Sequence, residues 1–135
     1  MCPISSTLDI LGDKWTLLII RDLMFKGKKT YGEFLQSEEK IATNILADRL
    51  LILEKNGIVE KSAFPGNKVK NLYRLTPKGL DLMPALIEMV LWGDTYFDVP
   101  ESVHRAAGEI RKDKNRAMKV ILERLTAGDP EAPTA

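Results

Sequence analysis

The sequence predicts a mainly α-helical fold with one small β-hairpin. Three observations predict it. Leu46, Leu50 and Leu53 recur at the spacing of one face of a helix. Gly57 follows and ends that helix, because glycine adopts the left-handed conformation of a helix C-terminus without penalty. Two short runs of strand-forming residues then flank the turn sequence Pro-Gly-Asn-Lys at residues 65–68.

Composition indicates an ordinary soluble protein. The chain has 135 residues, 44% hydrophobic and 29% charged, which suggests one domain with a complete core. Cys2 is the only cysteine, so an intrachain disulfide is excluded. No apolar run approaches the roughly 18–20 residues of a membrane span, and the N-terminus lacks the pattern of a signal peptide. We therefore expect a cytoplasmic protein without a membrane anchor.

Charge is unevenly distributed along the chain. The net charge is +1, but residues 1–80 carry 13 Lys/Arg against 9 Asp/Glu, and residues 81–135 carry 7 against 10. Between Lys61 and Leu80 there are five cations and no acid. This block is the main electrostatic anomaly of the sequence.

The N-terminal part predicts an arm followed by a helix. Residues 1–4 are expected to form a short extended arm, and Ser6-x-x-Asp9 is expected to cap a first helix. Apolar residues then recur at helical spacing over residues 8–23, and Gly12 is expected to bend or divide this helix.

The next segment predicts a helix-turn-helix. Thr30-x-x-Glu33 is a capping box, which predicts a short helix over residues 31–37. Residues 38–40 form a turn into the longer helix that contains the three leucines. A short helix, a tight turn and a longer helix in this order are typical of a DNA-binding helix-turn-helix.

A hairpin and further helices follow. Residues 58–64 and 69–75 are expected to be its strands, and Thr76-Pro77 starts another helix, with threonine as its cap. Pro84 is expected to kink that helix or displace one turn. A last single helix is expected over residues 101–125. The order of elements is that of a winged helix-turn-helix.

Several motifs resemble one family in the same order and spacing. Cys2-Pro3 followed by LDILGDKWTLLIIRDL at residues 8–23 resembles the opening signature of the HxlR-type (MarR-like) bacterial transcriptional regulators. Arg49-Leu50 with Leu53-Glu54 and Gly57-Ile58-Val59 resembles the end of their recognition helix. Tyr73-x-Leu75-Thr76-x-x-Gly79 resembles the end of their wing. The resemblance covers residues 2–93.

This resemblance implies a homodimeric winged-helix DNA-binding protein with N- and C-terminal dimerisation helices. Carried over by position, the recognition helix is residues 43–56 and the wing tip is residues 65–70. The DNA-binding domain, with the N-terminal arm and helix, is then residues 1–97, the C-terminal dimerisation helix 98–125 and a flexible tail 126–135.

The sequence departs from the family pattern at two places. Thr30-Tyr31 stands where many members have Arg-Phe, and Ala42-Thr43-Asn44 where many have Ser-Pro-Lys. The second departure removes a cation, which affects the operator sequence rather than the fold.

Candidate DNA contacts lie on the recognition helix, before the capping box and on the wing: Thr43, Asn44, Ala47, Asp48, Arg49, Lys28, Lys29, Lys68 and Lys70. Asn44 is the first candidate for a base contact, because asparagine pairs with adenine N6 and N7 and the first turn of a recognition helix approaches base edges. Its alternative role is a local bond to the backbone. Lys68 and Lys70 neutralise phosphates or enter the minor groove, or only keep the hairpin soluble.

The other residues of the recognition helix have two interpretations each. Thr43 contacts a phosphate or a thymine methyl group, or it caps the helix. Asp48 accepts a hydrogen bond from cytosine N4, or it pairs with a cation on its own helix. Arg49 holds a phosphate, or it anchors the fold through an acid such as Glu33.

The remaining candidate sites are a redox site at Cys2 and a dimer interface. An exposed Cys2 is a redox-sensing thiol or an ordinary terminal cysteine, and it has no cation within ten residues in the sequence. His104 has no second histidine or cysteine at metal spacing, so neither a metal nor another cofactor is expected.

The last helix either pairs with a second subunit or packs on its own domain. The candidate interface residues are Leu8, Leu11, Trp92, Ile110, Ala117 and Ile121.

These observations lead to two functional hypotheses. The first is a sequence-specific transcriptional regulator that binds double-stranded DNA as a homodimer on a pseudo-palindromic operator and responds to a small molecule or a redox signal. Repression by occlusion is its simplest output, and activation is equally compatible with these residues. The alternative is a winged-helix protein-interaction module without operator specificity. An enzyme is the least supported class, because the sequence offers no nucleophile–base pair, metal cluster or phosphate-binding loop.

Overall fold

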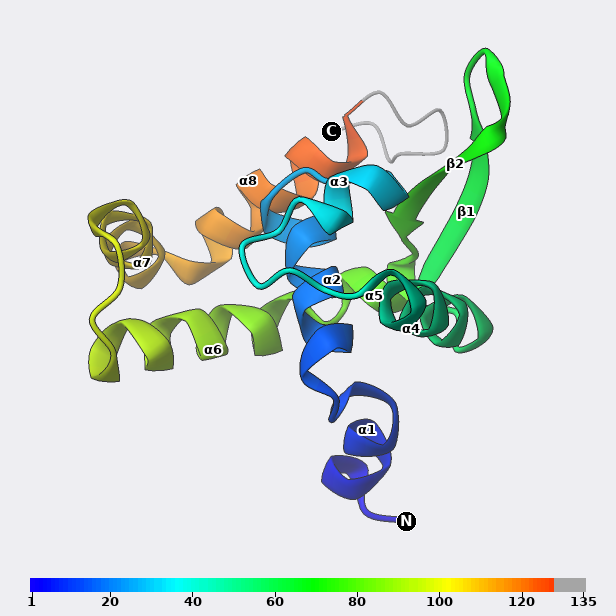
Figure 1. Ribbon diagram of the computed structural model, residues 1–135. Coiled ribbons are helices and arrows are strands. Elements are labelled where there is room, and N and C mark those ends of the chain that lie inside the picture. Colours follow the sequence, from blue (N-terminus) through cyan, green and yellow to red (C-terminus); the bar gives the residue numbers. More distant parts are fainter. Residues whose placement is uncertain (128–135) are drawn as a thin grey trace. The chain divides into compact units, whose positions relative to one another are not determined.

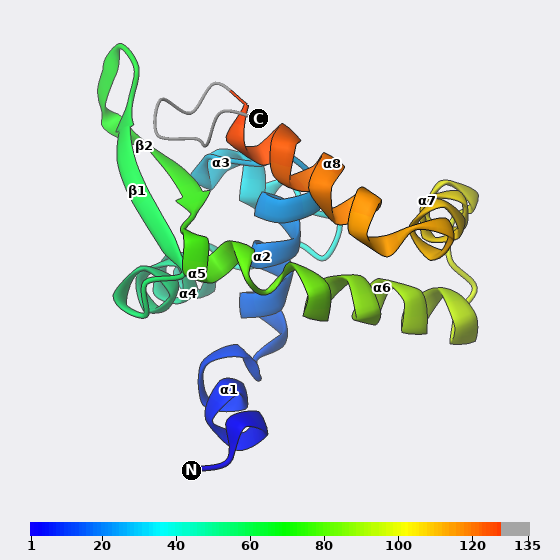
Figure 2. The same ribbon diagram turned by 180° about the vertical axis from the view of Figure 1, so that it is seen from behind.

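A computed structural model of the chain describes residues 1–127 (Figures 1 and 2). The chain divides into two compact units between Leu80 and Asp81, and each unit is described by itself. The first unit, residues 1–80, holds the helix-turn-helix and the hairpin. The second begins at Asp81 and contains the C-terminal helices. The predicted domain, residues 1–97, extends beyond the first compact unit; as a functional boundary it stays a prediction.

The first unit has the order of elements that the sequence predicts for a winged helix. Its helices and strands are α1 (Pro3–Leu11), α2 (Lys14–Phe25), α3 (Tyr31–Leu35), α4 (Thr43–Lys55), β1 (Val59–Phe64), β2 (Asn67–Leu75) and α5 (Pro77–Leu80). The two strands pair antiparallel as an isolated hairpin. The mainly α-helical class with one β-hairpin is therefore confirmed.

The helix-turn-helix follows from local sequence and from burial. The side chain of Thr30 accepts from the Glu33 amide while Glu33 accepts from the Thr30 amide, so the predicted capping box is present. Leu46, Leu50 and Leu53 are all buried, and α4 packs with this face against α2, α3 and β1. Gly57 ends the helix with a φ of 70°.

The hairpin is tied to the helices at its base. The register runs from Val59 opposite Leu75 to Ala63 opposite Asn71, and the turn contains Gly66 with a φ of 78°. The amide of Tyr73 donates to the carbonyl of Lys29 over 2.7 Å. This bond fixes β2 to the segment that precedes α3.

The second unit contains α6 (Met83–Tyr96), α7 (Glu101–Lys112) and α8 (Lys114–Thr126). The carboxylate of Asp94 on α6 is 2% exposed and binds two side chains of α7. It lies 2.8 Å from Nδ1 of His104 and 2.6 Å from Nη1 of Arg111. These ion pairs connect α7 with the C-terminal end of α6.

The N-terminus differs from the prediction. The expected extended arm at residues 1–4 is wrong, because α1 begins at Pro3, where a missing N–H costs nothing in a first helical turn. The cap is Cys2, whose Sγ accepts from the amide of Ser5 over 3.5 Å, and Ser6 lies inside the helix. The predicted division at Gly12 is confirmed, because α1 ends at Leu11.

The C-terminal helices also differ. The expected single helix over residues 101–125 is wrong: Asp113 has an extended backbone and separates α7 from α8. Its carboxylate accepts from the amide of Arg116 over 3.1 Å, so Asp113 acts as the N-cap of α8. Pro84 lies in the first turn of α6, and a break before Met83 replaces a kink.

The smaller differences concern element ends. The short helix ends at Leu35 instead of residue 37, β2 begins at Asn67 instead of residue 69, and α8 reaches Thr126. The rest of the predicted tail, from residue 128 on, lies outside the described residues. No helix within residues 1–127 is long and apolar enough to cross a membrane.

We expect Gly79→Ala to destabilise the first unit. A Cβ at Gly79 would lie 2.3 Å from the carbonyl oxygen of Ile58, so α5 would have to move away from the start of β1. The free energy of unfolding, measured by urea titration, should fall by about 1–3 kcal/mol. Gly32→Ala in α3 is the control, because a Cβ there meets no atom within 4 Å. It should be neutral or raise stability by up to about 1 kcal/mol. Equal effects of the two variants would contradict this packing argument.

Candidate nucleic-acid interface

The outer face of α4 carries small or polar residues, together with the apolar Leu51 and, in the last turn, Lys55. Thr43, Asn44, Ala47, Asp48 and Leu51 are exposed, opposite the buried leucines. We call these five residues the α4 strip. A 13-residue helix is about 20 Å long, and a strip of small side chains lets such a helix enter a major groove about 12 Å wide. The strip itself contains no Lys or Arg.

The first turn of α4 is held by another helix instead of a cap. Its N-cap residue, Ala42, makes no side-chain hydrogen bond to the helix. The hydroxyl of Tyr31 on α3 donates to the carbonyl of Thr43 over 2.8 Å. The side chain of Asn44 makes no hydrogen bond within residues 1–127 and is exposed. The structure therefore fixes the backbone of the first turn and leaves the Asn44 amide open to a ligand.

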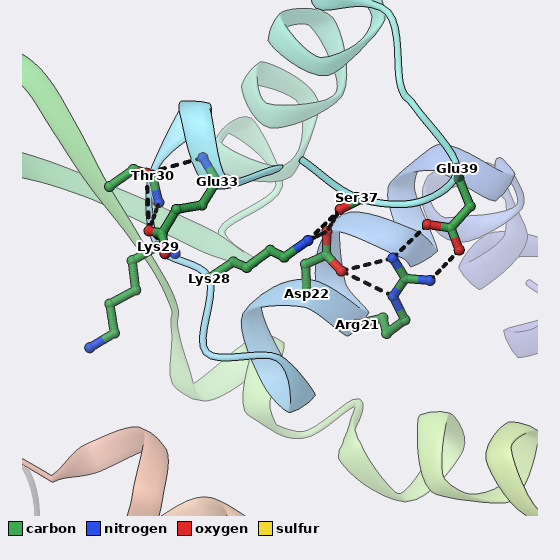
Figure 3. A network of polar contacts seen from close by, with 8 residues as sticks. All are labelled: Arg21, Asp22, Lys28, Lys29, Thr30, Glu33, Ser37 and Glu39. Carbon is green, nitrogen blue, oxygen red and sulfur yellow. Dashed lines mark hydrogen bonds and ion pairs between the residues drawn. The ribbon is translucent and has the colours of Figure 1, made fainter. Parts of the chain in front are cut away.

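A network of charged side chains fixes the loop that leads into α4 (Figure 3). Arg21 on α2 binds both oxygens of Glu39, over 2.6 and 2.9 Å. This pairing lowers the pKa of Glu39 to about 2 and raises the pKa of Arg21. The next residue, Lys40, has a φ of 56°, a left-handed conformation that a non-glycine residue keeps only where its surroundings impose it.

Asp22 forms the buried end of the same network (Figure 3). It is 2% exposed and accepts hydrogen bonds from Arg21 and from the hydroxyl of Ser37. The ammonium of Lys28 donates to that hydroxyl over 2.7 Å and lies 3.5 Å from Asp22. A buried carboxylate needs such partners, because an unpaired buried charge is costly. The network thus holds the α3–α4 connection against α2 at two points, Ser37 and Glu39.

This inward position of Lys28 changes its predicted role. Its side chain is only 19% exposed and its ammonium is occupied by Ser37 and Asp22. We therefore remove Lys28 from the candidate DNA contacts. Its neighbour Lys29 is exposed.

Arg49 has a different acid partner from the one predicted. The carboxylate of Glu33 is taken up by the amides of Lys29 and Thr30, so Glu33 is not the partner. Arg49 instead pairs with Asp13, the N-cap of α2, and with Asp48 on its own helix. The hydrogen bond from Arg49 is the main cause of the lowered pKa of Asp13. The predicted pairing of Asp48 with a cation of its own helix is confirmed.

The wing presents cations at its tip. Lys68 and Lys70 are exposed, and the ammonium of Lys70 lies 4.3 Å from the centre of the Phe64 ring. Oδ1 of Asn67 accepts from the amides of Val69 and Lys70 over 3.0 and 3.2 Å, which shapes the turn. The predicted wing lysines are thus displayed on an ordered turn, with the 90% exposed Val69 between them.

The predicted interface residues differ in exposure. Leu8 and Trp92 are 56% and 59% exposed, whereas Leu11 is 7% exposed in the single chain, so we correct Leu11 to a core residue. The predicted residues of α7 and α8, Ile110, Ala117 and Ile121, are half-buried.

Two further exposed aromatic residues, at the end of α6, were not predicted from the sequence. Tyr96 and Phe97 lie beside Trp92, with ring centres 5.0 and 5.6 Å from it. All three are more than half exposed. The available signal was the spacing of Trp92 and Tyr96, which are four residues apart and so share one face of the helix. Phe97 follows as the C-cap residue of α6.

A recess of about 10 Å³ lies between Trp15, Phe34 and Ile41, which is room for one water and far less than the roughly 300 Å³ of a small-molecule pocket. Among residues 1–127, no group of three or more His, Cys, Asp or Glu is arranged to hold a metal ion.

Comparison with known proteins identifies the family. The model of the HxlR-like helix-turn-helix family matches residues 10–101. The chain belongs to this family. Its members matched here are helix-turn-helix transcriptional regulators, so the predicted resemblance is confirmed, together with the regulator class and its DNA-binding helix-turn-helix.

Individual relatives of this HxlR-like chain include a transcriptional regulator and a redox regulator. The HTH-type transcriptional regulator YodB of Bacillus subtilis is 38% identical over 104 residues, which are 76% of this chain and 92% of YodB. The structure of reduced YodB is 40% identical, with a TM-score of 0.60, covering 71% of this chain and 94% of YodB. YodB has also been solved diamide-treated and quinone-bound. The redox regulator HypR in its oxidised form is 35% identical, with a TM-score of 0.63, covering 73% of this chain and 100% of HypR.

We expect Glu39→Gln to remove a pH-dependent part of the stability. The pKa of Glu39 is lowered to about 2 from 4.5 in the unfolded chain, so the Arg21 pair stabilises the fold above pH 4.5 and is lost as the pH falls towards 2. At pH 7 the variant should lose about 1 kcal/mol of unfolding free energy, because the pair is partly exposed.

Urea titrations of parent and variant between pH 7 and pH 2 measure this effect. Their difference should shrink as the pH falls below 4.5. Glu38→Gln is the control, because Glu38 is exposed and forms no ion pair within residues 1–127. A difference that stays constant down to pH 2 would show that Glu39 does not act through its charge.

Proposed function

We propose that this HxlR-like protein is a homodimeric repressor that binds a pseudo-palindromic operator in the cytoplasm. The α4 strip enters the major groove of double-stranded DNA, and the wing contacts the backbone or the minor groove. The observation that carries this proposal is the exposed α4 strip on a helix whose opposite face is buried in the same unit as the wing. Occlusion of a promoter is the simplest output of such binding.

Each proposed contact has a separate chemical role. Asn44 lies in the first turn and offers both an amide donor and an acceptor, which match adenine N6 and N7. Ala47 allows close approach and apolar contact with a thymine methyl group. Thr43 contacts a phosphate. Lys29, Lys68 and Lys70 neutralise phosphates and supply affinity that does not depend on sequence.

We propose a dimer because a pseudo-palindromic operator requires two copies of the strip. The exposed Leu8 of α1 and the exposed aromatic residues Trp92, Tyr96 and Phe97 are apolar surface that a second subunit would cover. Ile110, Ala117 and Ile121, half-buried in the single chain, would be buried further. The two recognition helices would then lie about 34 Å apart, one turn of DNA.

We propose Cys2 as the site where the signal acts. It is exposed, it is the only cysteine of the chain, and it caps α1 through its sulfur. The relatives YodB and HypR, solved in reduced and in diamide-treated or oxidised forms, support a redox signal. The quinone-bound form of YodB supports a small electrophile as the alternative signal.

The second candidate function is a protein-interaction module. The α4 strip carries an acid, Asp48, and an exposed Leu51, and the cation nearest to it on the outer face is Lys55 in the last turn of the helix, which is unusual for a surface that approaches phosphates. If this interpretation is correct, the protein will bind any duplex weakly and without selectivity.

Selection from a random duplex pool tests the main proposal, with Asn44→Ala as the variant. The parent should select a palindrome and bind it at least about 10³-fold more tightly than random duplex. Asn44→Ala should lower this ratio by about tenfold, because alanine cannot make the bidentate hydrogen bonds to adenine. Asn115→Ala, which changes an exposed asparagine on α8, should leave the ratio as it is. Failure of the parent to select any sequence would favour the interaction module.

The wing lysines should set the salt dependence. The double variant Lys68→Ala with Lys70→Ala should bind operator and random duplex more weakly by similar factors. The slope of log affinity against log salt should flatten by about 0.9 for each phosphate that is no longer neutralised. Lys112→Ala with Lys119→Ala removes the same charge from α7 and α8 and serves as the control. An unchanged slope for the wing variant would remove these lysines from the interface.

Oxidation should act through Cys2. In the dimer, two Cys2 thiols would give two protons and two electrons to diamide and form one intersubunit S–S bond. Non-reducing electrophoresis should show the linked dimer, and operator affinity should change by about 5–150-fold. Dithiothreitol should restore the affinity, and Cys2→Ala should not respond. A parent and a Cys2→Ala variant that respond alike to diamide would exclude Cys2 as the sensor.

A further inference from the structure

The guanidinium of Arg49 joins two carboxylates that lie on different helices. Its Nε lies 2.9 Å from Oδ2 of Asp13, and its Nη2 lies 3.2 Å from Oδ1 of the same residue. Its Nη1 donates to Oδ2 of Asp48 over 2.6 Å. All three nitrogens therefore have carboxylate partners within the chain. This arrangement leaves Arg49 poorly suited to hold a phosphate and well suited to position its partners.

Asp13 is the fixed end of this arrangement. It precedes α2, and its Oδ2 accepts from the amide of Thr16 over 3.1 Å and from the Thr16 hydroxyl over 3.4 Å. Thr16 is 1% exposed, so this cap is anchored in the core. The carboxylate of Asp13 is thus held in place by α2 before it binds Arg49.

Asp48 is the free end. Its side chain is 54% exposed and belongs to the α4 strip. One oxygen, Oδ2, binds Arg49, while Oδ1 accepts no hydrogen bond from any residue within 1–127. A bare carboxylate repels phosphates, but one that is paired with a guanidinium is neutralised. In the major groove a carboxylate oxygen accepts a hydrogen bond from cytosine N4.

We propose that Asp13 is a positioning residue for base recognition: through Arg49 it orients Asp48 so that the free carboxylate oxygen binds the amino group of an operator cytosine. This inference rests on the proposed function. In this role the acid of the α4 strip is a source of specificity instead of an obstacle to DNA binding. Because the Arg49 guanidinium is held by Asp13 through two nitrogens, its third nitrogen orients Asp48 before DNA binds, and the entropic cost of ordering the Asp48 side chain is small.

Operator selection with the parent, Asp48→Ala and Asp13→Asn tests this role. Asparagine caps a helix about as well as aspartate, but its neutral amide cannot accept from Arg49 with two oxygens. The parent should prefer cytosine at one position in each half-site by about tenfold. Asp48→Ala and Asp13→Asn should both lose the preference at that position and keep the preferences at the others. Thermal unfolding of each variant checks that the fold is intact.

Two further variants keep the test decisive. Asp9→Asn removes the same charge from the exposed face of α1, where Asp9 forms no ion pair within residues 1–127, and should keep the cytosine preference. If Asp13→Asn does not fold, Arg49→Lys takes its place, because lysine keeps the positive charge but lacks the planar fork that binds Asp13 through two nitrogens while a third binds Asp48. It should lose the same preference.

The failures of the two proposals are distinguishable. A parent that selects an operator without this cytosine, or an Asp13→Asn variant that keeps the preference, would overturn the positioning role alone. A parent that selects no sequence would overturn the proposed function and this inference with it.

Discussion

The burial of Leu46, Leu50 and Leu53 decides which residues of α4 can meet a ligand. These leucines share one face of the helix and are at most 3% exposed. A helix that buries one face must present the other, so Asn44 and Asp48 face outward as a consequence of packing. The same packing joins α4 to β1, and hence to the wing. The proposed recognition surface therefore results from the formation of the hydrophobic core.

Ion pairs add the orientation that apolar packing alone does not provide. Arg21 with Glu39 holds the loop before α4, and Arg49 with Asp13 holds the helix itself. Partly exposed pairs contribute modestly to stability, but their fixed donor geometry limits how the helix can shift. The buried Asp22 connects the loop to α2 through Ser37 and Lys28. We interpret these contacts as the frame that presents the α4 strip to DNA.

Membership of the HxlR-like family gives the class of protein, and the chemistry of the α4 strip and the wing supports a proposal for how it binds DNA. The family establishes a transcriptional regulator with a DNA-binding helix-turn-helix. The residues of this chain suggest how its proposed DNA contacts divide between affinity and specificity. Its α4 strip has no cation, and the outer face of α4 carries only Lys55, in the last turn, so most of the proposed affinity comes from the wing and from Lys29. The proposed specificity comes from Asn44 and Asp48. A regulator built in this way would owe more of its selectivity to base contacts than to charge.

Local sequence determined the helices and strands of the helix-turn-helix and hairpin. Tertiary structure decided which side chains pair with one another. The leucine spacing, the Thr30–Glu33 capping box and Gly57 act within a few residues, so the helix-turn-helix and hairpin were predictable. The inward orientation of Lys28 and the burial of Leu11 could not be predicted, because they depend on which surfaces of the helices pack together. Asp13 and Arg49 are 36 residues apart. No periodicity connects such a pair, because only the packing of α4 on α2 brings the two charges within hydrogen-bonding distance.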